Sequence, residues 1–221
     1  MCYRFSTQFT AKQLEEYYNA YELEHEYHLL DELNGFNYPE TAMIMDKAPT
    51  EIVVGKWGLF PSWAKPDFQK KANTLNAKIE TAETLASYKN SVSNRCIIPV
   101  QHFFEWQWQD SKGKVKKKFS IGLRDHKIFS LAGIYNLWTN PDTGKSYRTY
   151  SILTTEANDL MSEIHNTKKR MPVCLNRAMD KDWLEGRPLQ EFAFPNYDPK
   201  LVAEDRDIGI ADLFFPSVNS D

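Results

Sequence analysis

The chain has 221 residues, enough for one domain with a sizeable buried core. Its hydrophobic fraction of 42% and charged fraction of 26% are those of an ordinary soluble globular protein. The net charge of -3 argues against a protein that coats nucleic acid without specificity, although it leaves room for a local basic groove.

The cysteines and the hydropathy of the sequence exclude several further classes of protein. The three cysteines form no CxxC pair and have no histidine at zinc-ligand spacing, so we expect no disulfide framework, no metal and no cofactor. The N-terminus lacks the apolar core of a signal peptide, and no stretch is apolar enough to span a membrane. We therefore expect a cytoplasmic protein without a membrane partner, nucleoid-associated if bacterial, with a monomer as the default.

Residues 1–221 contain no repeat or linker and are interpreted as a single domain, which begins with a helix over residues 10–33. Thr10 and Gln13 have the spacing of a capping box at the start of this helix. His25 and His28 share a helix face, but two ligands without a third do not indicate a metal site. The acidic residues of this segment are interpreted as a solvated face; they are Glu15, Glu16, Glu22, Glu24, Glu26, Asp31 and Glu32.

Strands dominate the rest of the chain. The apolar runs that predict them cover residues 42–45, 52–57, 95–100, 102–108, 116–123, 128–138 and 147–153. Residues 58–66 are interpreted as a loop that carries exposed aromatic side chains. Two short helices are expected, one over residues 79–89 and one from Thr154 or Thr155 to about Ile164. Mostly antiparallel strands with peripheral helices predict the α+β class.

Cys2 is the first candidate for chemistry. Methionine aminopeptidase removes Met1 when the second residue is small, and the product here would be a 1,2-aminothiol. Its α-amine titrates near neutral pH, so it can form a Schiff base with an aldehyde, which the thiol then closes into a thiazolidine. The alternative is that Cys2 packs as a small hydrophobic residue, as we expect for Cys96 and Cys174.

Glu105 and His165 are candidates for proton transfer. Glu105 lies among aromatic residues, where an apolar setting would raise the pKa of its carboxyl group. The alternative is a strand glutamate that points to solvent. His165 follows the second short helix, whose dipole favours the protonated imidazole, and the alternative is a simple helix cap.

Several polar and aromatic residues could contact a nucleic acid. Asn76 precedes the expected helix over residues 79–89, so a capping role competes with an active-site role. Lys78 could reach a phosphate, and Trp63 could stack on a base or anchor its own loop. A candidate phosphate-binding loop follows His165 and contains Lys168, Lys169 and Arg170.

The order of the sequence motifs resembles a known family. The motifs are Met1-Cys-x-Arg-Phe5, Trp57-Gly-Leu-Phe-Pro-Ser-Trp63, Asn76-Ala-Lys-x-Glu-Thr81, Arg95-Cys-x-x-Pro99, Phe104-Glu-Trp106, Leu131-Ala-Gly-Ile-Tyr135, Thr154-Thr155, and His165 followed by Arg170-Met-Pro-Val173. Together they resemble the SRAP family, the SOS-response-associated peptidases, whose members crosslink to abasic sites in DNA. The resemblance is strongest over residues 2–183 and weaker over residues 184–221.

The resemblance implies an α+β domain around a strongly curved, barrel-like antiparallel sheet. It also implies a function in the DNA damage response: binding single-stranded DNA, capturing abasic sites as a thiazolidine on Cys2, and an associated lyase activity. Cys2 would then be the nucleophile, and Asn76 would position the reacting groups. Glu105 would transfer protons, and His165 would act on the sugar. The implied DNA contacts are Arg4, Trp63, Lys78, Lys168, Lys169 and Arg170.

Three features depart from the usual pattern of this family. Tyr3 stands where Gly is common, and Lys78 stands where Arg is usual. The spacing from His165 to Arg170 is two residues longer than usual. Two rival functions also remain open: an N-terminal-cysteine peptidase or amidohydrolase that removes Met1 itself, and a noncatalytic module that binds single-stranded DNA.

Overall fold

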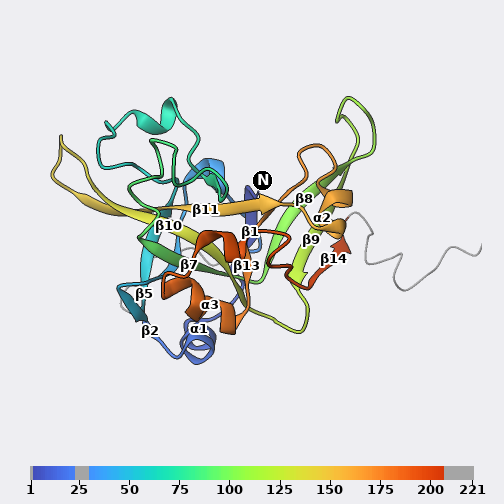
Figure 1. The fold of residues 1–221 in the computed structure, drawn as a ribbon, viewed down its shortest axis with the longest axis horizontal. Coiled ribbons are helices and arrows are strands. Elements are labelled where there is room, and N and C mark those ends of the chain that lie inside the picture. Colours follow the sequence, from blue (N-terminus) through green and yellow to red (C-terminus); the bar gives the residue numbers. More distant parts are fainter. Residues whose placement is uncertain (1, 23–29, 207–221) are drawn as a thin grey trace, which may run out of the picture.

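The computed structural model describes residues 2–22 and 30–206. Within these ranges the chain is mostly β, with short helices around the sheets, which confirms the α+β class (Figure 1). The α-helices are α1 Ala11–Tyr18, α2 Asp159–Ile164 and α3 Arg177–Leu184. The strands are β1 Arg4–Ser6, β2 Tyr21–Glu22, β3 Leu33–Asn34, β4 Glu40–Met45, β5 Ala48–Trp57, β6 Asn76–Lys78, β7 Arg95–Val100, β8 His102–Trp108, β9 Lys116–Leu123, β10 Phe129–Thr139, β11 Ser146–Glu156, β12 Arg170–Pro172, β13 Cys174–Leu175 and β14 Leu201–Asp205.

Five strands close into a barrel in the order β5, β4, β7, β10 and β11. Neighbours are antiparallel except at the closure, where β11 runs parallel to β5 and Tyr150 lies opposite Trp57. Gly133 on β10 allows the close approach of β7, because a Cβ there would lie 2.6 Å from Ile98 Cδ1 and 2.9 Å from Cys96 Sγ. The barrel-like sheet that the resemblance implies is therefore confirmed.

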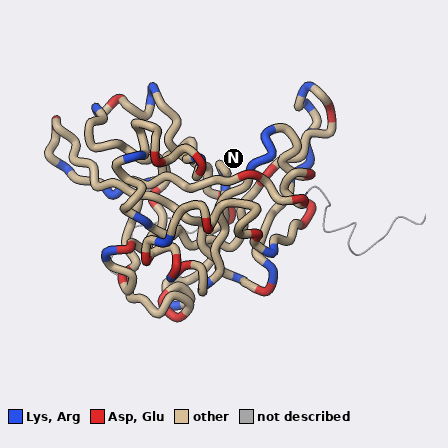
Figure 2. The backbone as a smooth tube through the Cα atoms, in the orientation of Figure 1, with Lys and Arg blue, Asp and Glu red and all other residues tan. Residues whose placement is uncertain are grey.

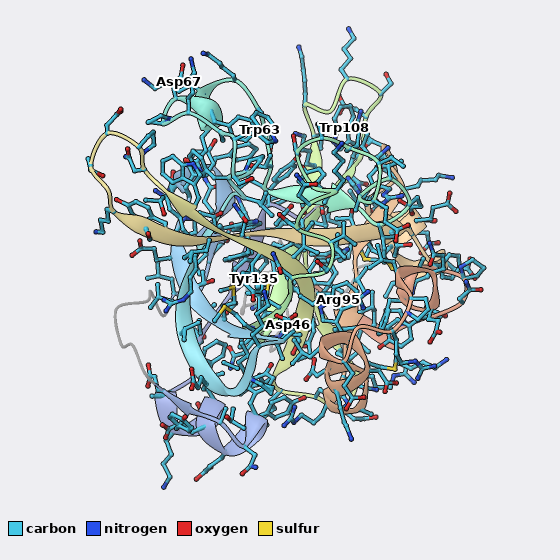
Figure 3. All side chains as sticks on the ribbon, turned by 60° about the vertical axis from the view of Figure 1, so that its left-hand side comes forward. Asp46, Trp63, Asp67, Arg95, Trp108 and Tyr135 are labelled. Carbon is cyan, nitrogen blue, oxygen red and sulfur yellow. The ribbon has the colours of Figure 1, made fainter. Side chains whose placement is uncertain are left out.

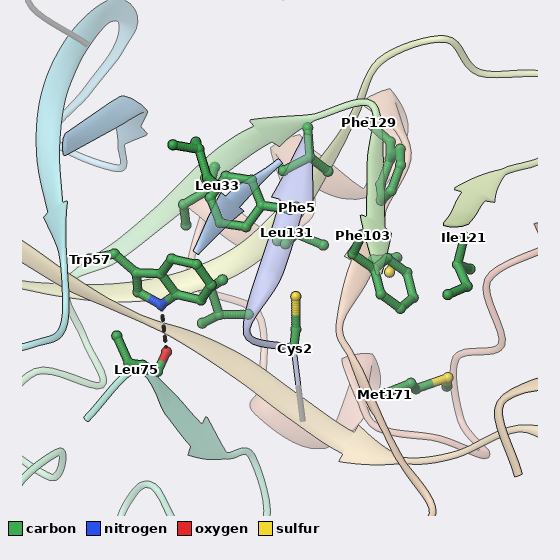
Figure 4. Packing of buried hydrophobic residues seen from close by; sticks show 14 of the residues in the cluster. Cys2, Phe5, Leu33, Trp57, Leu75, Phe103, Ile121, Phe129, Leu131 and Met171 are labelled. Carbon is green, nitrogen blue, oxygen red and sulfur yellow. Dashed lines mark hydrogen bonds between the residues drawn. The ribbon is translucent and has the colours of Figure 1, made fainter. Parts of the chain in front are cut away.

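A second sheet, in the order β14, β9, β8, β1 and β3, packs beside the barrel and shares an aromatic core with it (Figure 4). Trp57 of the barrel contacts Phe5 of β1, with ring centroids 4.8 Å apart, and its Nε1 donates a hydrogen bond of 2.8 Å to Leu75 O. Because β1 lies between β8 and β3, the first residues of the chain are held inside this sheet rather than at its edge.

The start of the helix predicted over residues 10–33 is confirmed. Thr10 Oγ1 accepts a hydrogen bond from Gln13 N–H, and the Gln13 side chain accepts one from Thr10 N–H. The apolar side chains Leu14 and Tyr18 are buried. The capping box and the apolar face therefore predict the beginning of α1 correctly.

For the described residues after Tyr18, that helix prediction is wrong. Asn19 adopts a left-handed conformation with φ of 49°, which ends α1, and Tyr21–Glu22 pairs with β5 as strand β2. The free energy gained when this segment pairs with β5 outweighs its preference for continuing the helix. His25 and His28 lie outside the described residues.

The helix predicted over residues 79–89 is also wrong. This segment forms consecutive turns, in which Thr84 N–H and Leu85 N–H both donate to Thr81 O. Thr84 Oγ1 donates to the same carbonyl over 3.0 Å. Such local side-chain bonds compete with a regular helical ladder.

The second short helix begins later than predicted. Thr154 and Thr155 lie in β11, where they pair with β12, and β-branched residues suit a strand. Asn158 caps α2 instead, since its Oδ1 accepts a hydrogen bond of 3.0 Å from Met161 N–H. The end of α2 at Ile164 agrees with the prediction. None of the helices in the described ranges is long and apolar enough to cross a membrane.

Candidate active site

The four predicted chemical residues come from four separate segments of the chain. Cys2 precedes β1, and Glu105 lies on β8, which pairs with β1. Asn76 begins β6, which pairs with β11, and His165 ends α2, which packs on β8. Figure 1 shows the start of the chain between the segment that precedes β6 and the β8–β9 hairpin. Strand pairing and the packing of α2 on β8 therefore bring these four segments together at the start of the chain.

Cys2 is fully buried, and its side chain belongs to the aromatic core shared by the two sheets (Figure 4). Its thiol donates to Arg4 O over 3.7 Å. Burial raises the pKa of the Cys2 thiol well above its ordinary value, and the Glu105 carboxylate raises this pKa further. The thiol is therefore protonated at neutral pH, and both sequence interpretations of Cys2, core packing and chemistry, remain compatible with its position.

Asn76 binds the backbone of Cys2 directly. Its Nδ2 donates a hydrogen bond of 2.8 Å to Cys2 O, across 74 positions of sequence. Its own backbone is fixed as well, because Tyr88 Oη–H donates to Asn76 O over 3.0 Å. Asn76 Oδ1 is buried and has no hydrogen-bond partner among the described residues. Asn76 begins strand β6, and turns rather than a helix follow it, so the alternative that it caps a helix is wrong.

Glu105 is buried, with 6% of its surface exposed. It lies two positions from Phe103 on β8, and strand alternation puts both side chains on the face that meets the core. The alternative of a solvent-facing glutamate is wrong for this reason. Burial raises the pKa of Glu105 to about 7, so this carboxyl group can give or take a proton near neutral pH.

His165 is neutral at physiological pH. Its pKa is lowered to about 4, chiefly by burial and then by the positive charges of the N-terminal amine, Lys168 and Arg170. The expectation that the helix dipole protonates this imidazole is wrong, because desolvation outweighs it. His165 Nδ1 lies 2.8 Å from Arg170 O and 3.3 Å from Arg170 N, and the shorter contact, with the carbonyl oxygen, favours the tautomer that carries hydrogen on Nδ1. In that tautomer Nε2 is the proton-accepting nitrogen.

The loop that carries His165 is bonded to the strand that carries Glu105. Asn166 Oδ1 accepts a hydrogen bond of 3.1 Å from Trp108 N–H, and Asn166 Nδ2 donates one of 2.9 Å to Trp108 O. Gln107 Nε2 donates to Glu163 O over 3.0 Å. These contacts fix the segments that carry Glu105 and His165 relative to each other. Sequence reasoning missed them, because a side-chain amide facing a distant backbone leaves no local pattern.

Most of the predicted DNA contacts have exposed side chains: Trp63, Lys78, Lys168 and Lys169. Trp63 is 55% exposed, and Figure 3 shows it on the same side of the molecule as Trp108. Lysine and arginine residues also lie on the loop after α2 and on the β8–β9 hairpin, both beside the start of the chain (Figure 2). A surface with several exposed cations near the N-terminus suits an anionic ligand.

Arg170 differs from the other predicted contacts. Its Nη1 and Nη2 bind the Glu80 carboxylate at 2.9 and 2.8 Å, and Nη2 also donates to Thr154 O at 2.7 Å. The guanidinium is mostly buried and already bidentate, which argues against a direct phosphate contact. Its backbone carbonyl instead orients His165, so Arg170 is a positioning residue in this arrangement. Glu80 is the partner that sequence reasoning missed.

Arg4 is also paired. Its Nη1 donates to Glu32 Oε1 over 2.7 Å, and Lys118 Nζ binds the other oxygen of the same carboxylate. Glu32 is only 22% exposed in its side chain, so the interpretation of the acidic segment as a solvated face is wrong at this position. No three His, Cys, Asp or Glu side chains in the described part of the chain gather as metal ligands.

Known proteins are similar to this chain in sequence and in fold. The family model of the SOS response associated peptidases (SRAP) matches residues 1–200. The Abasic site processing protein YoqW of Bacillus subtilis is 40% identical over 130 residues, 58% of this chain and 55% of the relative. The Abasic site processing protein HMCES of Gallus gallus is 30% identical over 164 residues, 63% of this chain and 47% of the relative.

A solved structure supports the same grouping. The crystal structure of a protein from Bacteroides thetaiotaomicron has a TM-score of 0.80 at 28% identity, covering 97% of this chain and 95% of that one. The chain spans about half the length of the curated relatives it matches. Because the family model covers most of the sequence and the whole fold agrees, the chain belongs to the SRAP family.

Proposed function

We propose that this protein captures abasic sites in single-stranded DNA as a covalent adduct on Cys2, which becomes the N-terminal residue when Met1 is removed. The observation that carries the proposal is the contact of Asn76 with Cys2 beside a buried Glu105 whose pKa is about 7. Relatives named as abasic site processing proteins support the choice of substrate. The protein would act as a monomer on damaged DNA and would protect the site from breakage.

The reaction starts with the amine rather than the thiol, because the buried thiol is protonated. The α-amine of Cys2 adds to the aldehyde carbon of the ring-opened sugar, and loss of water gives an iminium ion. The sulfur then bonds to the iminium carbon, and the thiol proton leaves. Aldehyde and aminothiol thus combine into one thiazolidine and one water, with no change of oxidation state.

Glu105 and His165 take different protons in this scheme. Glu105 is coupled electrostatically to the Cys2 thiol, and its pKa near neutrality suits it to protonate the departing water and then accept the thiol proton. The neutral His165 would act as a base through Nε2. In the lyase side reaction it would take the C2′ proton of the iminium sugar, and the 3′ phosphate would leave.

A denaturing gel tests the proposal. We expect a heat-stable shifted band when the protein meets single-stranded DNA with one abasic site, and none with the same strand lacking that site. Absence of the band in a preparation whose mass shows loss of Met1 would contradict covalent capture. Cleavage of a peptide substrate by that preparation would then favour the peptidase function, and binding without chemistry would favour the noncatalytic module.

The Asn76→Ala variant tests the positioning role of the Asn76 amide. Loss of its hydrogen bond to Cys2 O leaves the reacting residue less constrained, so adduct formation should slow by about tenfold to a hundredfold. Noncovalent affinity for intact DNA should stay within about twofold, because Asn76 is not expected to contact phosphate. Single-turnover rates at saturating DNA measure the effect, with the exposed Asn90→Ala as control. Equal rates in the two variants would exclude a positioning role.

A further inference from the structure

Glu32 bridges two cations beside the start of β1. One carboxylate oxygen accepts from Arg4 Nη1 at 2.7 Å, and the other is bound by Lys118 Nζ from β9. Burial alone would raise the pKa of Glu32, but the hydrogen bonds from Lys118 and Arg4 reverse this and lower it. Glu32 is therefore ionised at neutral pH and bound on both oxygens, as an anionic ligand of this pair would be.

An aromatic ring lies under the same two cations. The Arg4 guanidinium carbon and Lys118 Nζ each lie 5.6 Å from the ring centroid of Trp106, and Lys118 Nζ also lies 4.7 Å from that of Phe104. Trp106 follows Glu105 directly on β8. The two cations and the ring thus form a cradle on the face of β8 opposite the Glu105 side chain, because consecutive side chains of a strand alternate between its two faces.

The cradle remains accessible at the surface. The side chains of Arg4 and Lys118 are 39% and 27% exposed, so a ligand from solvent can reach both. Further up the same hairpin, Lys116 Nζ lies 5.3 Å from the ring centroid of Trp108, repeating the pairing of a cation with an indole. A row of cations and aromatic faces matches the recognition of a single-stranded nucleic acid, whose phosphates and bases alternate along the strand.

We propose that Arg4, Lys118 and Trp106 form a binding subsite for a phosphodiester of single-stranded DNA, and that the Glu32 carboxylate occupies this subsite until DNA displaces it. The inference rests on the proposed function for the identity of the ligand. An incoming phosphate takes over the two cations from Glu32, so the protein exchanges one anion for another and forms few new ion pairs. Glu32 thereby lowers the noncovalent affinity for single-stranded DNA.

Glu32→Gln separates this role from a purely structural salt bridge. The amide keeps the shape but releases both cations, so binding of a single strand should tighten by about threefold to tenfold. The dependence of log affinity on log salt should steepen by about 0.7 for each additional phosphate that the protein neutralises. Lys118→Gln should change both quantities in the opposite direction. If Glu32 served only to hold the fold, Glu32→Gln would weaken binding or leave it unchanged.

The measurement is the fluorescence anisotropy of a labelled oligothymidylate without an abasic site, titrated with protein in the Cys2→Ala background over a range of salt concentrations. Glu185→Gln is the matched control, because it removes one negative charge from an exposed pair with Lys181 on α3. Thermal melting of each variant confirms that it is folded. Lys118→Gln tests the subsite without altering Glu32, so a folding defect in one variant does not decide the result.

Two outcomes would overturn the inference in distinguishable ways. If the strand binds but Glu32→Gln does not exceed Glu185→Gln, or Lys118→Gln does not weaken binding, the subsite is wrong while covalent capture stands. If no variant binds the strand at all, the inference fails together with single-stranded DNA as the substrate. Tighter and more salt-dependent binding by Glu32→Gln alone, with weaker binding by Lys118→Gln, supports the subsite.

Discussion

Replacing Cys2 with Ala should abolish the heat-stable adduct completely while leaving noncovalent DNA binding intact. The variant keeps an N-terminal amine but has no sulfur to close the ring, so any Schiff base hydrolyses during denaturation. Cys2→Ser should behave in the same way, and in both variants borohydride reduction before denaturation should trap the amine-linked intermediate. The measurement is the fraction of abasic DNA that shifts on a denaturing gel, with and without reduction.

A matched control for the loss of a thiol is Cys174→Ala, since Cys174 is equally buried but lies in β13. It should still form the adduct. A heat-stable band from Cys2→Ala would mean that another nucleophile captures the DNA. Failure of Cys2→Ser to give any borohydride-dependent band would argue against attack by the α-amine as the first step.

Replacing Glu105 with Gln should slow the reaction but stabilise the folded protein at high pH. The rate of adduct formation should fall by roughly 10²- to 10⁴-fold, the usual contribution of a positioned acid–base group. The wild-type rate should also show an ionisation near pH 7, from the raised pKa of Glu105, that the variant lacks. Single-turnover rates over a range of pH measure both effects. The exposed Glu163→Gln, with the same charge change, should behave like wild type.

The stability effect follows from the burial of the Glu105 carboxyl group. Its pKa rises from 4.5 to about 7, so the folded protein favours the protonated form. The stability that Glu105 contributes is therefore complete below about pH 4.5 and is lost as the pH rises through 7. At pH 8 the wild type should be less stable than Glu105→Gln by on the order of 3 kcal/mol, and at pH 4 the difference should vanish.

Urea denaturation of wild type and Glu105→Gln at pH 4, 6 and 8 measures this difference. A glutamate that stabilised the fold would give a variant that is less stable at every pH. The expected gain at high pH, together with a loss of rate, would mean that this buried carboxyl group is present for chemistry at the expense of stability. A pH-independent difference would contradict the raised pKa.

The fold could be predicted best where local patterns agree with tertiary pairing. Strands β7 and β9 have the predicted bounds, because continuous or alternating apolar residues suit a buried strand in either sheet. The long helix prediction failed after Tyr18, where Asn19 reverses the chain and a distant strand, β5, captures the next residues. No local pattern contains that pairing, so the sequence could not predict it.

The candidate site could likewise be predicted from the sequence only in part. Cys2, Asn76 and Glu105 could be selected from residue chemistry and from the order of their motifs. The protonation of His165 could not, since it depends on the burial of the imidazole in the folded chain. The pairing of Arg4 with Glu32 also needed the structure, because these residues meet only through the antiparallel contact of β1 with β3.

The most direct test of covalent capture is the mass of the crosslinked peptide after protease and nuclease digestion of the adduct. We expect the modified peptide to begin at Cys2, to lack Met1, and to carry the abasic remnant with the loss of one water. Its fragments should place both new bonds, to nitrogen and to sulfur, on Cys2. A remnant attached to a lysine, to Cys96 or Cys174, or to a peptide that retains Met1 would contradict capture by the N-terminal cysteine.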